Sequence, residues 1–283
     1  MFTIGSVKCK TIVVSNGKAS HAKTWIKFSP SDTWHEYDWK GEITLETATS
    51  EETIGYDYDE DTWTNQPYSV EIGTDVTTIG WGAFRKCKTL ADVMIPNSVT
   101  IIDGYPFDKC EGLTSVTIPD SVTSIGYMAF SGCTNLTNVT IGNGVTTIDG
   151  EAFAYCESLS NIVIGNNVTS IGSSAFLNCS SITSIDIPNS VTSISNDAFS
   201  VCTGLASIAI PDSVTDIGEY AFNCCVSLAN VTIGNGITNI GEEAFSECGN
   251  LTNVTFQGKT LAEVQAMDNY PWGIQDTSII TVA

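Results

Sequence analysis

The sequence predicts a repeat solenoid, a coil with a parallel β-sheet face and short helical or 3₁₀ turns, preceded by a small β-rich domain. Two observations support this. A phenylalanine recurs every 23 residues, eight times, and a cysteine always follows three residues later. Each unit also ends in three apolar residues at the spacing of Leu-x-x-Val-x-Ile, and in most units the last residues alternate apolar and polar. A 23-residue unit cannot bury its apolar face alone, so consecutive units must stack.

Residues 1–72 do not repeat and are expected to form the β-rich attachment or capping domain. Asn16-Gly17 after residues 11–15 is a β-hairpin signal. Residues 24–28 and 42–47 are expected to form further strands. The region holds four of the six tryptophans, namely Trp25, Trp34, Trp39 and Trp63. A β-domain with large rings in its core is the preferred interpretation; a glycan-stacking platform and a docking module for a larger assembly are the alternatives.

Residues 73–256 hold the eight units. In the third, Val139 and Ile141 are expected to point inward while the residues between them point outward, which yields a parallel sheet when units stack. The piece from Ala129 through Phe130 to Cys133 is too short for a regular α-helix, so a helical or 3₁₀ turn is expected. Corner residues that suit a chain reversal end each strand. These corners are Pro96, Pro119, Gly142, Gly165, Pro188, Pro211 and Gly234.

Residues 257–283 are expected to cap the coil, because a terminal unit would otherwise expose core and sheet edge. Thr260 to Glu263 fits a capping box. Leu261, Val264 and Met267 then predict a short amphipathic helix that reaches about Asp268. A final strand is expected to include Ile279, Ile280 and Val282.

The pattern Pro-x-Ser-Val-Thr-x-Ile-Gly-x-x-Ala-Phe-x-x-Cys-x-x-Leu-x-x-Val-x-Ile resembles the BspA-like class of leucine-rich repeats over about two-thirds of the chain. The resemblance implies a right-handed, gently curved coil. It also implies a surface or secreted microbial protein that adheres to proteins and host surfaces, with no catalytic residue in the motif. Departures from the pattern include Ile182 at the Leu position and Pro106 at the Ala position.

The net charge of −21 reflects missing basic residues, since residues 111–258 contain no Lys or Arg. Nucleic-acid binding requires cationic side chains against phosphates, so it is excluded as a function. Anionic membrane surfaces are disfavoured for the same reason. No apolar run is long enough to span a membrane, so no membrane insertion is expected. The N-terminus lacks a basic region followed by a long apolar run, so no signal peptide is expected.

Eight of the ten cysteines occupy one repeat position, where a small apolar side chain packs inside the coil. Parallel side chains on neighbouring units disfavour the dihedral angle that a disulfide needs. One thiol per unit cannot build a tetrahedral metal site, and no Cys-x-x-Cys pair is present. Buried reduced thiols are therefore expected. Cys9 and Cys224 lie off this column, and the pattern predicts nothing about their state.

No catalytic site and no cofactor are predicted. The two histidines, His21 and His35, lie outside the repeats, and no nucleophile motif accompanies them. Asp57, Asp59 and Asp61 have the alternate spacing that begins many calcium loops, but the glycine and glutamate that an EF-hand requires are missing. An acidic solvated loop is preferred there over a looser calcium site.

The candidate ligand surface is the outward side of the sheet. Its side chains are mostly short and uncharged. They are Asp92, Met94, Ser115, Thr117, Asn138, Thr140, Asn161, Val163, Ser184, Asp186, Ser207, Asn230 and Thr232. A column of threonines from Thr77 to Thr238 belongs to the repeat itself and is interpreted as a stacked short strand.

Two functions follow. The favoured one is a non-enzymatic adhesion module that binds protein or glycan on a host or cell surface. The alternative is a structural component of a phage particle, a tail or head appendage for host attachment that joins other subunits through residues 1–72. The expected location is accordingly extracellular, at the cell surface or on a virion.

Overall fold

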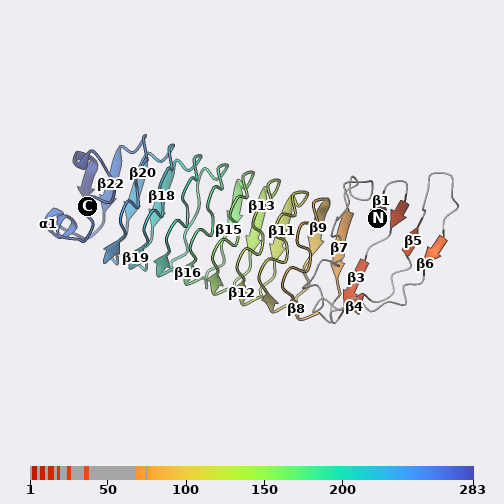
Figure 1. Cartoon of the computed structure of the whole chain (residues 1–283). Helices are drawn as coiled ribbons and strands as arrows, with labels where there is room; N and C mark the ends of the chain where they lie inside the picture. The colour runs from red at the N-terminus through yellow and green to blue at the C-terminus, as the bar shows by residue number, and fades with distance from the viewer. Residues whose placement is uncertain are drawn as a thin grey trace.

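The computed structural model describes residues 76–283 and, before them, residues 2–4, 7–9, 12–15, 18–19, 24–26, 35–37 and 68–73. From residue 68 onward the chain winds into stacked rungs, each rung being one 23-residue turn of the coil. Figure 1 shows these rungs arranged side by side along one axis, with α1 at the C-terminal end. The predicted solenoid is confirmed.

Short strands precede the coil in antiparallel pairs. The pairs are β1 (Phe2–Ile4) with β2 (Val7–Cys9), β3 (Ile12–Ser15) with β4 (Lys18–Ala19), and β5 (Thr24–Ile26) with β6 (His35–Tyr37). The pairing of β3 with β4 confirms the hairpin predicted at Asn16-Gly17. The strand expected at residues 42–47 lies outside the described residues, as do three of the four tryptophans, Asp57, Asp59, Asp61 and His21.

One face of the coil is a continuous parallel sheet of eight two-residue strands. These are β8 (Thr78–Ile79), β10 (Ile101–Ile102), β12 (Ser124–Ile125), β14 (Thr147–Ile148), β16 (Ser170–Ile171), β17 (Ser193–Ile194), β19 (Asp216–Ile217) and β21 (Asn239–Ile240). Beside it runs the threonine column, in which each hydroxyl donates to the threonine carbonyl of the preceding rung. Thr123 Oγ1, for example, lies 3.1 Å from the Thr100 carbonyl oxygen. These hydroxyls therefore bind rung to rung.

The other face carries longer parallel strands. They are β7 (Tyr68–Ile72), β9 (Leu90–Met94), β11 (Ser115–Ile118), β13 (Asn138–Ile141), β15 (Asn161–Val163), β18 (Ser207–Ile210), β20 (Asn230–Ile233), β22 (Asn253–Phe256) and β23 (Ile280–Val282). In β13, Val139 and Ile141 are buried while Asn138 and Thr140 are exposed, as the alternation predicts. This face is broken into three sheets, β4-β3-β7-β9, β11-β13-β15 and β18-β20-β22-β23.

Glycine corners hold neighbouring long strands together. The Gly142 N–H donates to the Ile118 carbonyl over 2.9 Å, and the Gly234 N–H donates to Ile210 over the same distance. A Cβ added at Gly142 would lie 2.6 Å from the Pro119 carbonyl carbon, which is closer than side chains tolerate. Glycine is therefore required where two rungs approach this closely.

Three of the four proline corners coincide with the breaks. Proline has no N–H and cannot supply the corner bond. The residue equivalent to Gly142 is Pro119 where β9 and β11 fail to pair, and Pro211 where residues 184–187 and β18 fail to pair. The equivalent residue is Pro188 where β15 and residues 184–187 fail to pair. At Pro96, β9 does pair with β7, but with a shift in register.

The core is a stack of phenylalanine rings. Neighbouring rings from Phe84 to Phe245 have centroids 4.9–5.5 Å apart and planes within 10° of parallel. All eight rings are buried, and each such residue contributes about 1.5–3 kcal/mol through the apolar area removed from water. This stack runs through every repeat unit without interruption.

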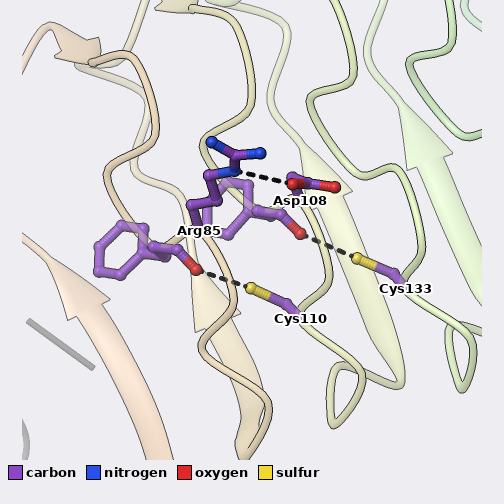
Figure 2. A network of polar contacts seen from close by, with 6 residues as sticks. Arg85, Asp108, Cys110 and Cys133 are labelled. Carbon is purple, nitrogen blue, oxygen red and sulfur yellow. Dashed lines mark hydrogen bonds and ion pairs between the residues drawn. The ribbon is translucent and has the colours of Figure 1, made fainter. Parts of the chain in front are cut away.

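The cysteine column lies directly behind these rings. Figure 2 shows that Cys110 Sγ donates to the Phe84 carbonyl over 3.0 Å and Cys133 Sγ to Phe107 over 3.2 Å. The same bond recurs in each later rung, to Cys248. Reduced thiols were predicted here, and from Cys110 to Cys248 the thiols form no disulfide. Cys224 is also reduced and is half-buried; Cys9 ends β2.

The expected 3₁₀-type turns form between short strand and cysteine, as where the Ala129 N–H donates to the Gly126 carbonyl over 3.2 Å, but they do not join into a regular helix. Two positions four residues apart have positive φ in these turns, as at Met128 (54°) and Gly132 (70°). Right-handed helices do not accommodate this conformation. Alternate N–H groups instead reach the next rung, so that Phe130 donates to Ala152 over 2.7 Å. Rung-to-rung bonding replaces the helix.

The C-terminal segment forms the capping box, the short helix and the final strand predicted for it. Helix α1 (Leu261–Gln265) begins at Thr260 with a complete capping box, in which Thr260 and Glu263 bond reciprocally. The helix is shorter than expected, and Leu261 is 42% exposed while Val264 is fully buried. After a short 3₁₀ turn, η2 (Thr277–Ile279), β23 pairs parallel with β22 and closes the last rung.

Candidate functional site

The outward side of the long strands presents the thirteen side chains proposed from the sequence. Twelve are exposed, and Thr232 is half-buried. The structure does not gather them in one place, because they follow the coil from β9 to β20. Five lie together at one hollow near the N-terminal end of the face.

This hollow lies where β9 and β11 fail to pair. It has a volume of about 530 Å³. From the predicted set it is lined by Asp92, Met94, Ser115, Thr117 and Thr140. Met94 is 61% exposed, the largest exposure among the large apolar side chains of the described residues.

Further lining residues were missed by the sequence analysis. Asn97, Pro119 and Asp120 lie at the corners beside the strands. A signal for them in the sequence is Pro119 itself, since this corner lacks the N–H that joins β11 to β13 at Gly142. Asp120 is oriented by the next rung, because its Oδ1 accepts the Asn143 N–H over 2.6 Å.

The chemistry of the hollow is an apolar floor with an acidic rim. Val93 and Ile95 line it and are 5% and 8% exposed, while Asp92 and Asp120 are exposed beside them. A small apolar recess edged by polar groups suits a protruding apolar side chain of a ligand. The two carboxylates favour a neighbouring cation on that ligand.

Farther along the coil, polar side chains on the same face form hydrogen bonds with one another. The Asn161 side-chain amide donates to Asn138 Oδ1 over 3.3 Å, and Asn138 donates to Thr137 Oγ1 over 2.7 Å. Amides that bond each other offer fewer groups to a ligand. The hollow is therefore the better candidate on this face.

A second polar cluster lies on the turn side of the first rungs. Figure 2 shows Arg85 beside Asp108, with Nε 2.9 Å from Oδ2. The Asp108 side chain is 4% exposed, and the guanidinium carbon lies 5.0 Å from the centroid of the Tyr105 ring. Later rungs place small or polar residues such as Ser131 and Ser200 at the Asp108 position. We interpret the pair as a structural contact that holds the first two rungs.

The thiols are not activated for chemistry. Burial raises the pKa of Cys202 to about 12, and a hydrogen bond with the Cys179 backbone acts in the opposite direction. Burial likewise raises the pKa of Cys133, Cys156 and Cys179 well above the ordinary value. A thiol is nucleophilic as its thiolate, which burial disfavours here. The column acts as a packing and hydrogen-bonding element.

Among the described residues, no three His, Cys, Asp or Glu side chains lie close enough together to hold a metal ion. Nor does any described helix have the length and apolar character that a membrane span requires.

The fold and the candidate site together define a class of protein. It is a parallel-stranded coil of short repeats, almost without helix, with a broad outward face. A family model described as "BspA type Leucine rich repeat region" matches residues 63–183 and 169–270. The chain belongs to this family. Leucine-rich repeat proteins are generally non-enzymatic binding modules and commonly bind proteins, so the family indicates a repeat-based binding or adhesion module.

Solved structures with related coils are similar to this chain. A leucine-rich repeat protein from Bacteroides ovatus is 29% identical with a TM-score of 0.53, covering 76% of this chain and 60% of that one. One from T. pallidum is 30% identical with a TM-score of 0.49, covering 51% and 73%. A leucine rich cell surface protein from Faecalibacterium prausnitzii is 23% identical with a TM-score of 0.39, covering 98% and 88%. A comparison with curated proteins finds no match.

Proposed function

We propose that the chain is a non-enzymatic adhesion module that binds a protein on a host or cell surface through the outward face of its long strands. The observation that supports this most directly is the hollow between β9 and β11, where five of the proposed ligand residues meet. The family's usual role in protein binding supports the same function.

The hollow also suggests what the ligand offers. Its apolar floor, Val93 and Ile95, suits an aliphatic or aromatic side chain, and burial of one such group contributes about 1.5–3 kcal/mol. The carboxylates of Asp92 and Asp120, in a chain of net charge −21, favour lysine or arginine beside that group. A basic, apolar-tipped segment of a surface protein is the proposed ligand.

A pull-down with mass spectrometry tests the proposal. The double variant Thr117→Arg/Thr140→Arg fills the hollow with two long cationic side chains and should abolish capture of the specific ligand. Thr232→Arg places the same side chain at the equivalent repeat position far from the hollow and should retain capture. Equal capture by all three proteins would eliminate the hollow as the binding site.

Residues 1–72 are proposed as the attachment domain. Comparing full-length protein with residues 73–283 tests this, since capture of the surface ligand should persist without the N-terminal part. Co-sedimentation with phage particles that requires residues 1–72 would instead favour the alternative role of virion component. A surface-exposed location is proposed together with the adhesion function, and labelling of intact cells with an antibody to the chain tests it.

A further inference from the structure

A row of aromatic side chains lies on the turn side of the first three rungs, away from the hollow. Trp81, Tyr105 and Tyr127 follow β8, β10 and β12. The ring centroids of Trp81 and Tyr105 are 5.3 Å apart, and those of Tyr105 and Tyr127 are 5.4 Å apart. Trp81 is 41% exposed and Tyr127 is 39% exposed. Large rings that remain exposed in contact with one another are unusual on a surface of short polar side chains.

Glycines on the next rungs set the positions of two of these rings. Residues 81, 104, 127 and 150 share one repeat position and read Trp, Gly, Tyr, Gly. A Cβ at Gly104 would lie 3.2 Å from Trp81 Cδ1, and one at Gly150 would lie 3.4 Å from Tyr127 Cδ2. Each ring therefore rests against the backbone of its neighbour. The alternation places Trp81 and Tyr127 two rungs apart, about 10 Å at the usual strand spacing.

The polar groups around the row are mainly carboxylates. Tyr127 Oη donates to Glu151 Oε1 over 2.6 Å. Asp103 and Asp149 each accept the N–H of the following glycine through Oδ1 and are exposed to solvent. Carboxylates next to exposed rings disfavour an anionic ligand and accept hydrogen bonds from hydroxyl groups.

A cationic ligand fits less well. The rings stand in a row along the coil and do not surround a common centre. The guanidinium of Arg85 already lies 5.0 Å from the Tyr105 centroid and is held there by Asp108. A second cation at this ring would meet that positive charge.

We propose that Trp81, Tyr105 and Tyr127 form a binding site for a neutral glycan chain, distinct from the protein-binding hollow. Apolar C–H faces of sugar rings pack on Trp81 and Tyr127, and sugar hydroxyls donate to the carboxylates of Glu151, Asp103 or Asp149. The ligand runs along the coil axis, so successive sugar rings meet successive rungs. The backbone contacts that fix the rings reduce the entropy lost on binding.

Affinity electrophoresis of the full chain tests the site. Native gels each contain one soluble polysaccharide: hydroxyethylcellulose, xylan, galactomannan, laminarin, dextran or, as the acidic comparison, polygalacturonate. At least one neutral polysaccharide should retard the protein, and polygalacturonate should not. Trp81→Ala and Tyr127→Ala should each weaken binding about tenfold or more, as loss of an aromatic anchor does. Tyr127→Phe keeps the ring and should weaken it less.

Tyr220→Ala is the matched control, because Tyr220 is 40% exposed in a later rung. It should bind like the parent chain, and so should Thr117→Arg/Thr140→Arg, whose change lies in the hollow. Thermal unfolding of each variant shows that the coil is intact. The proposal is overturned if no neutral polysaccharide retards the parent, if only polygalacturonate does, or if the Trp81→Ala/Tyr127→Ala double variant is retarded as strongly as the parent.

Discussion

Residues 73–118, the first two repeat units, carry four lysines and arginines, whereas residues 119–256, the following six, carry none. The phenylalanine stack and the cysteine column pass through both regions. The surfaces differ: the first region holds the half-buried Arg85–Asp108 pair and contributes Met94 to the hollow and Trp81 to the aromatic row. The comparison teaches that the two proposed binding features vary along a repeat whose core stays constant.

The largest expected effect concerns the core that both regions share. Phe153→Ala should destabilise the coil by about 3–5 kcal/mol, because it empties a ring position between two stacked neighbours. Phe84→Ala should cost less, since within the described residues Phe84 stacks on Phe107 alone. Urea unfolding measures both. A larger loss for Phe84 would mean that the first rungs hold the coil together more than the middle ones.

The ion pair of the first region should give the next largest effect. Arg85→Ala leaves the Asp108 carboxylate buried without its partner and should cost about 1.5–3 kcal/mol. Adding Asp108→Ser, which copies the later rungs, should restore most of that loss. The double-mutant cycle is read from unfolding free energies. Absence of coupling between the two changes would contradict a structural role for the pair.

The thiol column predicts a pH dependence. Because the pKa of Cys202 is raised to about 12 in the folded chain, the fold retains a proton that the unfolded chain loses above about pH 9. The free energy of unfolding should therefore be unaffected by this thiol below pH 9 and fall as pH rises toward 12. The contribution of one proton is about 1.4 kcal/mol per pH unit. Cys202→Ala should show a shallower decline in urea unfolding between pH 9 and 11; an identical slope would refute it.

The smallest effect tests why the hollow lies at β9 and β11. Pro119→Gly supplies the missing N–H, and a new bond to the Ile95 carbonyl should add about 0.5–1.5 kcal/mol. The greater freedom of glycine in the unfolded chain offsets this by about 0.4–1 kcal/mol, so net stability should change little. Amide hydrogen exchange should show a protected N–H at residue 119, and ligand capture should weaken. An N–H that exchanges as fast as one in a solvent-exposed loop would contradict the proposed cause of the break.

The coil, its inward positions and its capping box could be predicted because they repeat. Val139, Phe130 and Cys133 recur at 23 residues, and recurrence in sequence implies recurrence in space. The conformation of the turns was harder to predict. Met128 has a positive φ, but the residue type at its repeat position varies between units and does not indicate this conformation. Leu261 was expected to pack inward from helical spacing, but at the first position of α1 it is 42% exposed.

The candidate site was predicted only as a face. The alternation in each strand predicted that Asp92 and Thr140 lie on the outward side. The sequence of a single unit does not predict which neighbouring long strands fail to pair. That information is in the comparison of corners, where Pro119 stands in place of a glycine. The aromatic row could not be predicted from the repeat pattern, because Trp81 and Tyr127 occupy variable positions. The placement of their rings depends on the glycines one rung away.

The corner residues imply a simple route for evolutionary change. Three proline corners lie at strand breaks and glycine corners such as Gly142 lie where strands pair, while the buried phenylalanines and thiols are common to both kinds of rung. A lineage with such a coil can thus move a recess of this kind along the coil in steps of one rung, or create a second recess, by point substitutions at corner residues.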